Sequence, residues 1–186
     1  MSFLTATKQV QFSKRIKAPR STVLAFIQQP KNLIDLSPVV IDAAASSDDP
    51  NTWMITDKLS VLCLPFTTKY TSTFKLTDNG IDSETRAAAG VVLGDNWIAN
   101  AVDGDAGSTD VVENVEVKAN ILLLPFTVSG LQDAHNQMLE NLAEKLESGG
   151  GSNGQTGDAV TTPKAATDEP AKPPPTANDQ VDTSGP

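Results

Sequence analysis

The sequence predicts an α+β domain in which an antiparallel sheet curves around one long C-terminal helix. Residues 126–147 carry apolar or aromatic side chains at the spacing of one helix face, with polar residues opposite. Residues 39–119 hold six alternating segments joined by short turns, which is typical of a meander. An amphipathic helix and a one-sided sheet bury their apolar faces most simply against each other. The helix face consists of Leu131, His135, Met138, Leu139, Leu142 and Leu146.

The first 38 residues predict one strand followed by two short helices. Residues 4–16 place Leu4, Val10, Phe12 and Ile16 on one side of an alternating pattern. Pro19 suits the first turn of a helix, because its missing amide hydrogen would be unpaired there. Pro30 ends this helix, and residues 32–36 form a further helical turn before Pro38.

Six strands follow in close succession, and together with the opening strand they make a seven-stranded sheet. Asp78-Asn79-Gly80 and residues 103–107 are turn sequences between them. Such short links favour antiparallel neighbours. The expected strands are 39–45, 52–60, 67–76, 81–88, 96–102 and 109–119.

The composition divides the chain into a domain at 1–147 and a tail at 148–186. The tail has no aromatic residue and no Leu, Ile or Met, and it is rich in Gly and Pro. Such a segment cannot bury enough apolar surface to offset its ordering entropy, so we expect a disordered acidic tail. The net charge is −9 without a prominent basic stripe, which argues against nucleic acid as a partner.

Other features predict a soluble cytoplasmic protein without a metal or cofactor. The chain shows no secretory signal and no apolar run long enough to span a bilayer. Its single cysteine, Cys63, permits no internal disulfide. Phosphate-binding and dinucleotide-binding motifs are absent from the sequence, and one histidine makes a typical zinc site implausible.

Three short motifs near the N-terminus carry a family resemblance. Ile16-x-Ala18-Pro19, Val23-x-x-Phe26 and Pro30-x-Asn32-Leu33, in this order of elements, resemble the START/SRPBCC superfamily. This is the helix-grip fold of pollen allergens, lipid-transfer domains and aromatic polyketide cyclases. The resemblance covers nearly all of residues 1–147, and within it the chain looks most like uncharacterised members from filamentous fungi. It implies a ligand cavity between the sheet and the last helix.

Strand alternation indicates which side chains line that cavity, and many of them are small or hydroxylated. Such residues favour an open, partly polar pocket over a filled core. The face of the 96–102 strand is ambiguous, and its tryptophan either packs or stacks on a flat ligand. The expected ligand-binding residues are Trp53, Ile55, Asp57, Leu59, Phe66, Thr68, Tyr70, Ser72, Phe74, Ser83, Thr85, Trp97, Val111, Val115, Phe126, Leu131, Met138 and Leu139.

Four residues in the inward registers could act together in proton transfer: Asp57, Tyr70, Glu113 and His135. A carboxyl group in an apolar cavity has a raised pKa, and histidine titrates near neutral pH without tuning. His135 and Glu113 are therefore the candidate catalytic pair. In the alternative interpretation, His135 is a hydrogen-bonded core residue and Glu113 faces solvent through a register slip.

Three apolar loops are expected at one end of the sheet. Residues 62–67 and 122–127 nearly repeat each other, and residues 89–94 fall at the same end of an antiparallel meander. An apolar rim marks a ligand entrance, a surface for transient membrane contact or a protein contact. Alternatively, these residues only cap the core.

Three functions remain open. The first is a carrier or receptor for a hydrophobic small molecule such as a lipid, sterol or polyketide. The second is a cyclase or dehydratase that uses His135 and Glu113, and the third is a protein-interaction module. The oligomeric state is not determined by the sequence.

Overall fold

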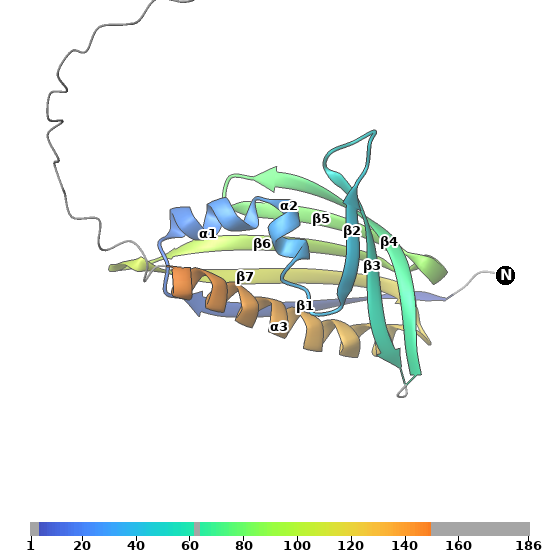
Figure 1. Ribbon diagram of the computed structural model, residues 1–186. Helices are drawn as coiled ribbons and strands as arrows, with labels where there is room; N and C mark the ends of the chain where they lie inside the picture. The colour runs from blue at the N-terminus through green and yellow to red at the C-terminus, as the bar shows by residue number, and fades with distance from the viewer. Residues whose placement is uncertain (1–3, 62–63, 150–186) are drawn as a thin grey trace, which may run out of the picture. The chain divides into compact units, whose positions relative to one another are not determined.

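The computed structural model describes residues 4–61 and 64–149, which form a curved sheet with three helices (Figure 1). Two predicted features lie partly outside these ranges. They are the 62–67 loop, of which Leu62 and Cys63 are not described, and the tail, which is not described from residue 150 onward. The elements are β1 (Thr5–Ile16), α1 (Arg20–Ile27), α2 (Pro30–Ile34), β2 (Val40–Ala45), β3 (Thr52–Val61), β4 (Leu64–Thr77), β5 (Gly80–Ala87), η1 (Ala88–Gly90), β6 (Val92–Val102), β7 (Asp105–Asn120) and α3 (Leu124–Gly149).

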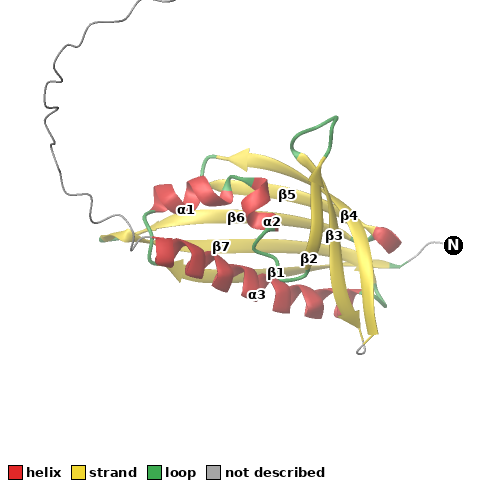
Figure 2. Ribbon diagram, in the orientation of Figure 1, coloured by secondary structure: helices red, strands yellow, loops and turns green. Residues whose placement is uncertain are grey.

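The seven strands form one antiparallel sheet in the order β1-β7-β6-β5-β4-β3-β2, which confirms the predicted fold. The sheet bends over the three helices (Figure 2). Helix α3 contacts β1 and β7, and α1 contacts β5, β6 and β7. No helix within the described ranges is long and apolar enough to cross a lipid bilayer.

The strand register fixes which side chains face the helices. Phe12, Glu113 and Trp97 lie opposite one another across β1, β7 and β6, and Ile55 lies opposite Tyr70 across β3 and β4. Directly paired residues point to the same face of a sheet. The predicted inner faces of β1, β3, β4 and β7 are therefore confirmed, and the alternative in which Glu113 faces solvent is wrong. The face of β6, which the sequence left ambiguous, is resolved with Trp97 directed inward.

The core is densest at the end of the sheet where α1 and α2 lie. Ile16, Val23, Ile27 and Val111 are completely buried there. The hydroxyl of Thr109, also completely buried, donates a hydrogen bond of 2.8 Å to the carbonyl of Ala18. The Arg20 guanidinium donates one of 2.8 Å to the carbonyl of Ala99. Helices, core and hydrogen bonds together close this end of the domain.

The main departure from the predicted elements is β6, which begins at Val92 and not at residue 96. Gly94 interrupts the strand pattern in the sequence, so the 89–94 segment was expected to be a loop. In the structure a Cβ at Gly94 would meet nothing within 4 Å, and the strand continues through it. As a result Asp95 is a strand residue whose side chain points to the inner face, opposite Ser83 and Val115.

Other boundaries shift by a few residues. The last strand runs over 105–120 rather than 109–119, and the long helix over 124–149 rather than 126–147. The long helix therefore extends two residues past the predicted domain end at residue 147, and the division into domain and tail stays a prediction. Pro30 occupies the first turn of α2, so the second short helix covers 30–34 instead of 32–36.

Candidate functional site

The inner face of the sheet holds a buried cluster of Glu113, His135 and Asp95. Glu113 lies in the middle of β7 with its side chain fully buried, and His135 reaches it from α3. Nδ1 of His135 and Oε1 of Glu113 are 2.5 Å apart. Asp95 on β6 completes the cluster, because one ligating atom from each of the three residues lies within 4.8 Å of the others.

Two carboxylate oxygens in this cluster make no hydrogen bond within residues 4–61 and 64–149. They are Oε2 of Glu113 and Oδ1 of Asp95, and both atoms are buried. The other oxygen of Asp95 accepts a hydrogen bond of 3.2 Å from the Ser83 hydroxyl. Leaving a buried polar atom without a partner costs roughly 1–3 kcal/mol, so such atoms are rare and call for an explanation.

The pKa values of all three groups in the cluster are raised. Burial raises the pKa of Glu113 to about 7, although the hydrogen bond and the charge of His135 oppose this rise. Burial also lowers the pKa of His135, but the hydrogen bond and the charge of Glu113 outweigh it and raise this pKa. Burial raises the pKa of Asp95. Groups with shifted pKa values of this kind are concentrated at functional sites.

The imidazole of His135 contacts Phe12 on one side and Glu113 on another. Its ring stacks on Phe12 with centroids 5.5 Å apart and an interplanar angle of 22°. The side chain keeps 16% of its exposure, whereas Glu113 behind it has none. With Nδ1 bound to Glu113, Nε2 is the ring nitrogen left for a ligand. The arrangement is a hydrogen-bonded acid–base pair of which only the histidine has some exposure.

A second polar group lies on β3, β4 and β5. The Tyr70 hydroxyl donates a hydrogen bond of 3.0 Å to Oδ1 of Asp57, and the hydroxyls of Ser72 and Thr85 are 2.5 Å apart. Burial raises the pKa of Asp57, and it raises that of Tyr70 with help from the charges of Asp57 and Asp95. The four predicted ionisable residues thus form two pairs, Asp57–Tyr70 and Glu113–His135.

The predicted ligand-binding residues fall into three groups by burial. One group is packed into the core: Ile55, Ser72, Phe74, Thr85, Trp97, Val111, Val115, Leu131 and Leu139, and Asp57 is equally buried. A half-buried group remains accessible on the inner face: Trp53, Leu59, Thr68, Tyr70, Ser83 and Met138. Phe66 and Phe126 are 43% and 65% exposed. The half-buried group is the part best placed to touch a ligand.

Asp95 is the site residue that the sequence analysis missed. It lies between the predicted apolar loop at 89–94 and the predicted strand at 96–102, and neither prediction includes it. The available signal was the alternation Leu93, Asp95, Trp97, Ala99, which continues the inward register of β6 across the glycine.

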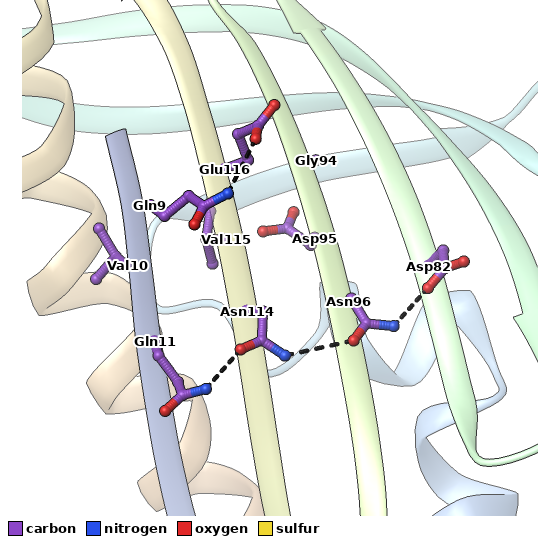
Figure 3. Close-up of a pocket in the computed structure, with 10 residues that line it drawn as sticks. All are labelled: Gln9, Val10, Gln11, Asp82, Gly94, Asp95, Asn96, Asn114, Val115 and Glu116. Carbon is purple, nitrogen blue, oxygen red and sulfur yellow. Dashed lines mark hydrogen bonds between the residues drawn. The ribbon is translucent and has the colours of Figure 1, made fainter. Parts of the chain in front are cut away.

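A shallow depression of about 770 Å³ on the outer face of the sheet is a different feature (Figure 3). Side chains of Gln11, Asn114, Asn96 and Asp82 form a hydrogen-bonded row across four strands, with donor–acceptor distances of 2.7, 3.4 and 2.6 Å (Figure 3). Because these groups satisfy one another and the depression is open, it offers little to enclose a ligand.

The donor set of Asp95, Glu113 and His135 also matches what a divalent cation requires. Two carboxylates and one imidazole suit Mn²⁺, Fe²⁺ or Zn²⁺ in chemical type. The expectation that the chain has no metal site relied on its single histidine and did not take these two buried carboxylates into account.

Comparison with solved structures identifies the fold. The Zhui aromatase/cyclase from Streptomyces sp. R1128 matches with a TM-score of 0.65 at 13% identity, over 81% of this chain and 100% of that one. A START superfamily protein from Mycobacterium smegmatis matches with a TM-score of 0.58 at 10% identity, over 75% and 97%. Norcoclaurine synthase from Thalictrum flavum, in complex with dopamine and hydroxybenzaldehyde, matches with 0.57 at 16% identity, over 77% and 88%. The fold is the START/SRPBCC helix-grip fold, as predicted.

The sequence defines the family more narrowly. Residues 15–148 match the family described as "Domain of unknown function (DUF7053)", and the chain belongs to this family. No curated protein matches the sequence. The resemblance to filamentous-fungal members stays a prediction.

Proposed function

We propose that this protein binds a hydrophobic small molecule with carbonyl or hydroxyl groups, of polyketide or phenolic type, and transfers protons on it. The molecule would lie between α3 and the inner face of the sheet. The observation that carries the proposal is the buried His135–Glu113 pair, 2.5 Å apart, with Asp95 beside it. The buried carboxylate oxygens of this cluster that lack hydrogen-bond partners within the described residues cost stability. Binding of a ligand would explain why the protein keeps them.

Polar atoms without partners support the ligand half of this proposal. The indole N–H of Trp53 is buried without a hydrogen-bond partner in the described part of the chain, as are the two free oxygens of Glu113 and Asp95. One donor and two acceptors without partners on the inner face suit a flat ligand that carries oxygen groups at separate positions.

The pair supplies both functions needed for enolisation and dehydration. One member removes a proton from the carbon next to a carbonyl, and the electron pair of the broken C–H bond forms the enolate. When the enolate re-forms the carbonyl, a C=C bond forms and a β-hydroxyl leaves as water after accepting that proton. The pair ends with the proton it began with, so the net change is the loss of one water molecule.

The structural relatives are consistent with this chemistry. An aromatase/cyclase and norcoclaurine synthase share the fold, and the second is seen with two phenolic compounds. At 13–16% identity they establish the fold alone, so the choice of substrate class rests on the cluster itself. The cytoplasmic location expected from the sequence stays a prediction.

The test uses deuterium exchange at the α-carbon of a 1-aryl-1,3-diketone, followed by NMR, with binding of the same compound measured in parallel. We expect exchange to fall roughly 10²- to 10⁴-fold in His135→Gln and in Glu113→Gln, with binding changed much less. Thr109→Val, a buried hydroxyl at the closed end, serves as the matched control and should exchange at the wild-type rate.

The outcomes separate the alternatives. If wild type binds the diketone but its exchange equals that of both variants, the protein is a carrier and the proton-transfer part is wrong. If it neither binds nor exchanges any of a set of aryl diketones, the ligand class is wrong. Loss of exchange in chelator, restored by Mn²⁺ or Zn²⁺, would assign the cluster to a metal ion instead.

A further inference from the structure

The end of the sheet opposite α1 carries a group of exposed apolar side chains, which we call the apolar rim. It is built where β1 begins, where β3 meets β4, and where β7 passes into α3. In an antiparallel sheet of this order, these points fall at one end. The rim consists of Leu4, Phe66, Ile121, Leu122, Leu123 and Phe126, which are 75%, 43%, 52%, 77%, 40% and 65% exposed.

The rim is held in place by hydrogen bonds, so its exposure does not come from a frayed loop. The amide of Ile121 donates to the carbonyl of Leu4 at 3.0 Å, and the amide of Leu122 donates to the Asn120 side chain at 2.9 Å. The amide of Thr127 donates to the carbonyl of Leu123 at 3.0 Å. Bulky apolar groups are thus presented to solvent on a fixed backbone, which marks an interaction surface.

A ring of positive charge surrounds the rim. The sequence has no Asp, Glu, Lys, Arg or His in 1–7, 59–68, 87–94 or 119–132. Five of the seven ionisable residues that border these segments are basic, exposed and located on five different strands, and Arg86 among them pairs with Glu84. The two acidic borders are Asp133 and the inward-facing Asp95. The basic ring consists of Lys8, Lys58, Lys69, Arg86 and Lys118.

This pattern stands out against a net charge of −9. A negative chain is repelled by a negative surface unless it presents a locally positive face. Apolar groups at the centre and lysines at the border are the arrangement that binds an anionic lipid surface: the first enter the headgroup region and the second contact lipid phosphates.

We propose that the apolar rim and its basic ring dock on an anionic lipid bilayer. A second copy of this chain fits the surface less well, because a symmetric pair would bring two basic rings face to face. Docking would place the N-terminal end of α3, eleven residues before its catalytic candidate His135, against the lipid. This inference does not depend on whether the interior is catalytic.

The test is co-sedimentation of the full chain with phosphatidylcholine vesicles, with and without phosphatidylserine. We expect binding at least tenfold tighter with phosphatidylserine, and weaker as salt is raised. Leu122→Ser/Phe126→Ser should reduce binding at least tenfold. The matched control is Met54→Ser/Leu76→Ser, which removes apolar groups that are 59% and 58% exposed but lie outside the rim.

A second pair of variants tests the charges separately. Lys69→Gln/Lys118→Gln should weaken binding to phosphatidylserine vesicles about tenfold, whereas Lys17→Gln/Lys75→Gln, outside the ring, should not. The proposal is wrong if the wild-type protein binds neither kind of vesicle. It is also wrong if the rim variants and the control variants weaken binding equally. Light scattering that shows a dimer lost in Leu122→Ser/Phe126→Ser would assign the rim to a second copy.

Discussion

The two ends of the sheet treat apolar residues in opposite ways. At the closed end, α1 and α2 cover the strands, and Ile16, Val23 and Ile27 have no exposure at all. At the open end, side chains of similar size, such as Leu122, remain up to 77% exposed. Burial of these side chains stabilises the closed end. The open end is free to serve binding, and the acid–base cluster lies between the two.

The largest effect on stability is expected from the closed end. Ile27→Ala leaves a cavity in a fully buried site and should lower the free energy of unfolding by about 3–4 kcal/mol. Leu122→Ala at the open end should change it by less than about 0.5 kcal/mol. Urea denaturation of both variants measures the contrast, and equal losses would contradict the division into two ends.

A smaller effect, dependent on pH, is expected from the cluster between the ends. The folded-state pKa of Glu113 is about 7, above its ordinary value of 4.5, so folding favours its protonated form. The stability that this proton supplies is complete below about pH 4.5 and is lost as the pH rises through about 7. The raised pKa of His135 acts in the same direction, with stability lost as the pH rises through its folded-state value.

Glu113→Gln should therefore make the unfolding free energy less dependent on pH. Relative to wild type, the variant should gain up to about 2–3 kcal/mol between pH 5 and pH 8. Denaturation at both pH values measures this gain. A variant that follows the wild-type pH profile would show that Glu113 does not hold its proton in the folded state.

The hydrogen bonds that close the α1 end are expected to contribute less. Thr109→Val leaves the buried carbonyl of Ala18 without its hydroxyl partner and should cost about 1–2 kcal/mol at every pH. Thr109→Ser keeps the hydroxyl and is the control. If both variants lose the same amount, packing of the methyl group is responsible and not the hydrogen bond.

The smallest effect is expected for a surface ion pair. Nζ of Lys31 lies 2.5 Å from Oδ1 of Asp35, but both side chains are about half exposed. Lys31→Gln should change the unfolding free energy by less than about 0.5 kcal/mol, and less again at high salt. A larger loss in the denaturation midpoint would mean that α2 depends on this pair.

Periodicity predicted most of the fold because it depends on one alternation per strand and one stripe per helix. The inward positions of Glu113 and His135 followed from it and are confirmed. Their pairing was a hypothesis from these registers, but the 2.5 Å contact could not be predicted, since it depends on how far the sheet curves toward α3. Asp95 was not predicted, because the expected strand begins at residue 96, whereas pairing of β6 with β5 and β7 extends the strand back to Val92.

One distant contact limits how the cluster can vary. At the start of β5, a Cβ on Gly80 would lie 1.7 Å from the carbonyl oxygen of Trp97, and Trp97 is the neighbour of Glu113 across β6 and β7. Any side chain at this turn must therefore push β6 away from its place. Gly80→Ala lies on β5, a strand that contributes no member of the acid–base pair. Its first effect would nevertheless be on the spacing of Asp95 and Glu113.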